Sequence, residues 1–137
     1  MGATTVHTLS LYAALLALLF VALSIRIIRL RRSLHIALGD SGNETLLRAI
    51  SVHANFAEYV PLSLILLCLM EGQGAHPALL HGLGVILLTG RLSHAYGVSQ
   101  AHENFRFRVV GMALTFTTLI TSSAYLLVAG LLQIGSV

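Results

Sequence analysis

Polar side chains able to bind a charged ligand recur on one face of a stretch that is otherwise apolar. They are Arg48, Asn55, Glu58 and Tyr59. A helix advances about 100° per residue, so these positions fall within roughly one third of its circumference, with Ser51 among them. An almost unbroken apolar run follows. The stripe is therefore expected to face the inside of a membrane protein, where polar groups are costly and usually functional.

Glu58 is the most demanding member of this stripe. It lies roughly 15 Å along the helix axis from Arg48. A carboxylate at that depth needs an arginine, a ligand ammonium or trapped water as a partner. Asn55 is one turn away and offers both a donor and an acceptor. Two interpretations stay open: the stripe binds a ligand, or it only hydrogen-bonds a neighbouring helix. Glu44, four residues before Arg48, predicts an ion pair, and His53, more than about 100° away, is expected to serve local packing.

Two later clusters would extend the stripe into a pocket. Arg91 and His94 are three residues apart and share a helix face, with Tyr96 following, and Arg106 and Arg108 open the last predicted helix. If both clusters lie near the stripe, the cytoplasmic half of the protein holds a basic pocket with one buried carboxylate. Because arginine forks bind carboxylates, such a pocket suits a ligand that carries carboxylates and an amine.

The composition places these residues in a membrane protein. The chain has 137 residues, enough for one domain over 1–137, and is 56% hydrophobic but only 9% charged. Soluble domains carry about 25% charged residues. The net charge of +3 comes from arginines at the ends of apolar runs, so a nucleic acid partner is not expected. The single cysteine, Cys68, excludes an internal disulfide, and no spaced ligand pair predicts a metal site.

The hydrophobic pattern predicts an all-α bundle of four transmembrane helices. They cover about 9–25 with its flanks, 44–71, 78–98 and 109–134. The third is the weakest span, and its glycines are expected to allow close helix packing. Arginines follow the first run rather than precede it, which favours a retained helix over a signal peptide. All eight arginines fall at one side, so both termini are predicted outside the cytoplasm. Four of these arginines are expected only to meet lipid headgroups and set topology: Arg26, Arg29, Arg31 and Arg32.

The stripe resembles the signature of the MAPEG family, membrane-associated proteins in eicosanoid and glutathione metabolism. Its most specific part is Asn55, Glu58 three residues on, and Pro61 three beyond that. The segment 53–62 is similar to bacterial members, and 90–97 and 108–112 resemble later blocks of that branch. The resemblance implies a homotrimer of four-helix subunits in a bacterial inner membrane.

The resemblance also implies roles for individual residues. Glutathione would be the co-substrate, bound between subunits in the cytoplasmic half. Arg108 is expected to activate its thiol, with Arg106 as second choice, because a nearby cation stabilises the nucleophilic thiolate. The residues expected to hold the tripeptide or to line its pocket are Arg48, Asn55, Glu58, Tyr59, Arg91, His94 and Tyr96.

Two departures from the family pattern bear on function. Ser51 stands where many members carry a second arginine, and His94 and Tyr96 stand where several relatives use tyrosines. The leading hypothesis is a transferase or peroxidase that acts on a lipophilic electrophile arriving through membrane lipid. A non-catalytic lipid-binding or scaffold protein of the same fold is the alternative, and ion or proton conduction past Glu58 is the third.

Overall fold

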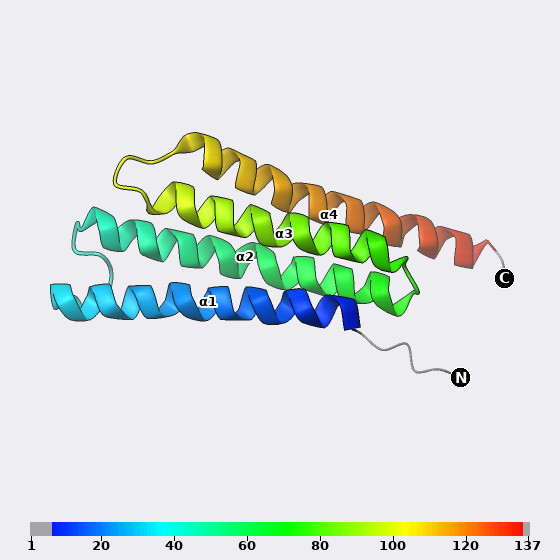
Figure 1. Cartoon of the computed structure of the whole chain (residues 1–137), viewed down its shortest axis with the longest axis horizontal. Helices are drawn as coiled ribbons and strands as arrows, with labels where there is room; N and C mark the ends of the chain where they lie inside the picture. The colour runs from blue at the N-terminus through cyan, green and yellow to red at the C-terminus, as the bar shows by residue number, and fades with distance from the viewer. Residues whose placement is uncertain (1–6, 136–137) are drawn as a thin grey trace.

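The protein consists of four helices that run alternately up and down (Figure 1). The structure is a computed structural model that describes residues 7–135. The helices are α1 (His7–Leu34), α2 (Glu44–Gly72), α3 (Pro77–Ser99) and α4 (Phe105–Ile134). The predicted all-α class and the four helices are confirmed. Helices α2 and α3 each contact the other three, whereas α1 and α4 do not touch within 7–135.

Side chains at the helix starts explain why the helices begin where they do. Asn43 caps α2, since its Oδ1 accepts a hydrogen bond from the backbone N of Leu46 at 2.9 Å. His76 and Asn104 cap α3 and α4 in the same way. Helix α2 continues through Pro61, although proline removes one backbone hydrogen bond. The second helix therefore carries the whole stripe on one continuous element.

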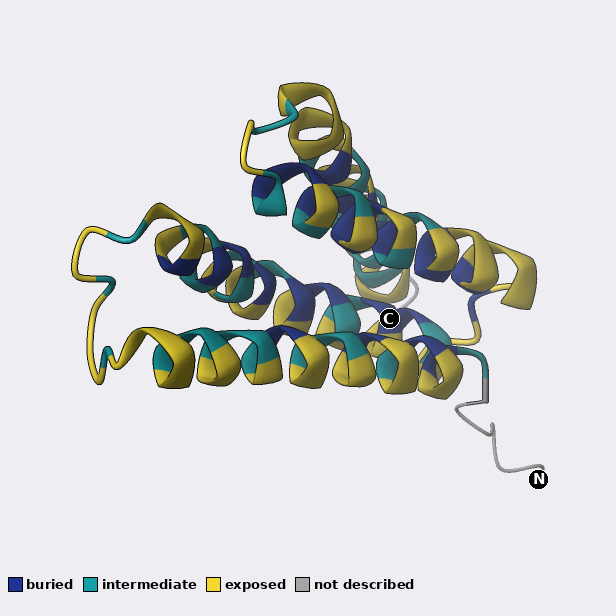
Figure 2. Cartoon of the chain, turned by 60° about the vertical axis from the view of Figure 1, so that its left-hand side comes forward, coloured by how far each residue is buried: buried dark blue, intermediate teal, exposed yellow. Residues whose placement is uncertain are grey.

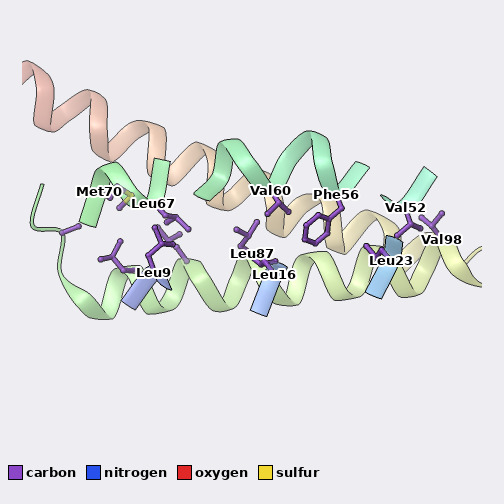
Figure 3. Packing of buried hydrophobic residues seen from close by; sticks show 13 residues of the cluster. Leu9, Leu16, Leu23, Val52, Phe56, Val60, Leu67, Met70, Leu87 and Val98 are labelled. Carbon is purple, nitrogen blue, oxygen red and sulfur yellow. The ribbon is translucent and has the colours of Figure 1, made fainter. Parts of the chain in front are cut away.

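The apolar core lies between α1, α2 and α3 (Figure 3). Helix α1 contributes Leu9, Leu16 and Leu23, spaced by seven residues, which keeps them on one seam of the helix. Figure 2 shows buried residues on the facing sides of the helices and exposed residues outside. The outer surface is also apolar: Leu18 and Ile120, for example, are 67% and 68% exposed. An apolar exterior of this kind is stable in lipid and not in water.

Within the described residues, three helices are long and apolar enough to cross a membrane, namely α1, α2 and α4. The sequence predicted four spans, and α3 does not meet the same standard by composition. It carries His81, Arg91, His94 and several glycines, which dilute its apolar character. Arg91 and His94 are nevertheless buried against the other helices. These two polar side chains of α3 therefore lie in the interior of the bundle.

Helices α3 and α4 approach closely where glycines face each other. A Cβ atom on Gly111 would lie 2.6 Å from the carbonyl oxygen of Gly90 and 2.6 Å from the backbone N of His94. At Gly97, a Cβ would lie 2.8 Å from the backbone N of Arg108. Small residues allow backbones to approach in this way. The predicted close packing is thus present at Gly90, and it fixes the start of α4 against the end of α3.

A methyl group at Gly111 is expected to push α3 and α4 apart. The atoms it would meet are two backbone atoms and the Cβ of His94, none of which can rotate away. We expect Gly111→Ala to lower the free energy of unfolding by about 1–3 kcal/mol, measured as a lower midpoint of thermal unfolding in detergent. Gly130→Ala is the matched control, because it lies on the same helix with no atom within 4 Å of its Cβ position. Equal midpoints for the two variants would contradict this account.

Candidate functional site

A groove of about 530 Å³ lies where α2 meets the end of α3 and the start of α4. Five of the nine residues predicted from sequence line it, and they come from three helices. Glu44, Ser51 and Glu103 also line it. The five predicted residues are Arg48, Asn55, Glu58, His94 and Arg108. The groove therefore joins most of the stripe on α2 to the later clusters.

Glu103 forms ion pairs with two arginines of the groove. Its Oε1 lies 2.6 Å from Nη1 of Arg108, and its Oε2 lies 3.7 Å from Nη1 of Arg48. Arg48 also donates to the carbonyl oxygen of Val98 at 3.5 Å. The predicted Glu44–Arg48 ion pair is absent among the described residues, because Arg48 reaches across to the α3–α4 loop instead. Glu103 was not among the predicted site residues, although an acidic residue five positions before Arg108 is a visible signal in the sequence.

Arg91 lies beneath the groove and is only 1% exposed. Its Nη2 donates to Oδ1 of Asn55 at 2.6 Å, and its Nη1 donates to Oγ1 of Thr115 at 3.3 Å. Nη1 also lies 3.9 Å from the sulfur of Met112, and the guanidinium carbon lies 5.9 Å from the ring centroid of Phe56. Nε has no hydrogen-bond partner among the described residues. Arg91 thus fixes the amide oxygen of Asn55 and leaves the amide nitrogen available to a ligand.

Three predicted residues do not line the groove of the single chain. Tyr59 packs edge-on against Phe116 with ring centroids 5.7 Å apart. Tyr96 packs against Phe107 at 5.1 Å and is 55% exposed. Arg106 lies in a separate depression formed by the α3–α4 loop. Their roles in a ligand site stay predictions.

Glu58 is exposed at the side of the groove. No ion pair joins it to any residue of the described part of the chain. His53, by contrast, packs against α1: its Nε2 lies 2.9 Å from Oγ of Ser24 and its ring stacks on Phe20. The carboxylate of Glu58 therefore faces outward from a helix that is long and apolar enough to span. In lipid it requires a partner from outside this chain.

Comparison with known proteins identifies the family. The sequence model of the MAPEG family matches residues 9–128. The chain belongs to the MAPEG family. It is similar to inner membrane protein YecN of Escherichia coli strain K12, with 41% identity over 111 residues that cover 81% of this chain and 83% of YecN. YecN of the O6:H1 strain gives the same values. The family predicted from the stripe is confirmed, and the chain is a multi-pass membrane protein.

The bond between Arg91 and Asn55 predicts a stability effect. Asn55→Ala would leave a buried, charged donor without its nearest acceptor, which costs about 1–3 kcal/mol. We expect a lower midpoint of thermal unfolding in detergent. Ser51→Ala is the control on the same helix, because the Ser51 hydroxyl bonds only to the carbonyl oxygen of Leu47, 2.9 Å away. If Asn55→Ala unfolds at the wild-type temperature, Arg91 does not depend on this acceptor.

Proposed function

We propose that this MAPEG protein is a glutathione-dependent membrane transferase or peroxidase that acts on lipophilic electrophiles. The observation that carries the proposal is the groove itself, lined by Arg48, Asn55, Glu58 and Arg108. These are the residue types that bind carboxylates, amides and an ammonium group. Glutathione carries all three, and MAPEG proteins often bind it.

Each residue has a role that follows from its chemistry. Arg48 receives a glutathione carboxylate, Glu58 receives the α-ammonium group, and the free amide nitrogen of Asn55 donates to the peptide. Arg108 stabilises the thiolate over the thiol, and the thiolate is the nucleophile. Attack of the thiolate on the electrophile forms a carbon–sulfur bond. In a substitution the leaving group departs as an anion, and in an addition the product takes up a proton from water. The lipophilic partner reaches the groove from the bilayer.

The proposal includes an arrangement in the membrane. Helix α3 lies beside α2 and α4 along the bundle (Figure 1), so it crosses with them as a fourth span. The arginines mark the cytoplasmic side and both termini lie opposite. A homotrimer then supplies the partner that Glu58 lacks and brings Tyr59, Tyr96 and Arg106 within reach of a site between subunits.

A non-catalytic lipid-binding role is the second candidate, and one feature favours it. A separate apolar groove of about 280 Å³ lies between α1 and α2, lined by Phe20, Phe56 and Pro61 among others. Such a groove accepts an acyl chain without any polar contact. Calorimetry with the detergent-purified protein distinguishes the two candidates. Binding of glutathione supports the enzyme, and retention of lipid with no response to millimolar glutathione supports the lipid binder.

Arg108 is expected to be essential for chemistry and not for assembly. We predict that Arg108→Ala abolishes conjugation of glutathione to a lipophilic electrophile such as a chlorodinitrobenzene, because the thiol then keeps its proton at neutral pH. Arg32→Ala is the control, since Arg32 lies in the last turn of α1 and does not line the groove. It should retain most of the turnover. Unchanged turnover in Arg108→Ala, with the oligomer intact, would remove Arg108 from the mechanism.

A further inference from the structure

The groove contains a carboxylate supplied by the protein itself. Glu103 belongs to the loop between α3 and α4, yet its side chain is only 17% exposed. It contacts Arg108 and Arg48, the two arginines that line the groove. An external carboxylate would need the same guanidinium groups. The groove is thus already occupied at its basic end.

The loop that carries Glu103 is fixed on both sides. Before it, Ser99 accepts a hydrogen bond from Nη1 of Arg26 on α1. After it, the backbone N of Asn104 donates to the carbonyl oxygen of Gly97 at 3.1 Å, and the side chain of Asn104 caps α4. The segment 100–103 lies between these two attachments. Glu103 can therefore leave the arginines by movement of this short segment, without unwinding α3 or α4.

We propose that Glu103 is an internal counter-ion that occupies the carboxylate position of the groove, so that a carboxylate ligand binds only by displacing it. This inference rests on the proposed function for the identity of the natural ligand, but its chemistry applies to any carboxylate. Displacement exchanges the Glu103 carboxylate for anionic groups of the ligand: a carboxylate on Arg48 and, for glutathione, the thiolate on Arg108. The arginines are paired in both states, and the released Glu103 enters the water at the end of the bundle.

The competition has a calculable scale. A group tethered by a short flexible segment acts at an effective concentration of about millimolar or higher. A free carboxylate ligand must compete with this effective concentration of Glu103. The apparent affinity of the groove for the ligand therefore depends on Glu103 as well as on the two arginines. Such a groove binds few carboxylate metabolites at low concentration. It binds a ligand that is abundant or that makes further contacts, for example with Asn55 and Glu58.

The test compares Glu103→Gln with Asp40→Asn. Both changes remove one negative charge from a loop, and Asp40 does not line the groove. Asparagine at position 40 also keeps an oxygen for the turn, where Oδ1 accepts from the backbone N of Gly42 at 3.0 Å. Binding of glutathione and, separately, of succinate is measured by calorimetry on the full-length detergent-purified protein. We expect Glu103→Gln to lower the apparent Kd of both probes by about tenfold or more, with Asp40→Asn unchanged.

The outcomes separate this inference from the proposed function. Tighter binding of succinate by Glu103→Gln, with no glutathione binding by any variant, supports the counter-ion and overturns glutathione as the ligand. Glutathione binding and turnover that are equal in the wild type and Glu103→Gln support the enzyme and overturn the counter-ion. The counter-ion is also overturned if Asp40→Asn tightens binding as much as Glu103→Gln. Failure of every chain to bind either probe overturns both proposals.

Discussion

A buried guanidinium that has no carboxylate partner among residues 7–135 joins the helices of this bundle. Arg91 of α3 donates to Asn55 of α2 and to Thr115 of α4, so one side chain joins three of the four helices. Burying such a charge is favourable only if its hydrogen bonds are made with good geometry. Thr115 can accept from Arg91 because its own hydroxyl donates to the carbonyl oxygen of Gly111 at 2.8 Å. These hydrogen bonds require α2, α3 and α4 to pack in one register. The same register determines how the residues of these helices line the neighbouring groove.

The close approach of α3 and α4 also fixes how these two helices pack against each other. Gly90 and Gly111 leave no room for a side chain between the two backbones. Farther along, Gly97 leaves no room for a Cβ against the backbone N of Arg108, and its carbonyl oxygen accepts from the backbone N of Asn104. The turn between the helices is consequently short and tightly placed. This geometry directs Glu103 back over the groove, where it reaches an arginine on each of two helices.

The sequence was sufficient for the features that depend on local pattern. Helix positions, the Asn43 cap and the grouping of Arg48, Asn55 and Glu58 follow from periodicity and capping chemistry. The prediction of a Glu44–Arg48 ion pair was wrong because spacing within one helix does not account for an acceptor on another segment, here Glu103. Glu103 was missed for the same reason. The contact of Arg91 with Asn55, rather than with the groove, likewise depends on how far α3 rotates toward α2, which no single helix pattern specifies.

Two residues of the stripe on α2 have different surroundings: Asn55 bonds within the bundle and Glu58 is exposed. Asn55 is satisfied within the chain, since Arg91 takes its amide oxygen, whereas Glu58, three residues later, faces outward from an apolar helix. Both belong to one helix face, so rotating α2 to bury Glu58 would break the bond to Arg91. In this arrangement, residues 7–135 supply Asn55 with a partner but supply no ion pair to Glu58. A carboxylate that faces lipid is costly, so a water, a lipid headgroup or another molecule at the open side of the groove would stabilise it.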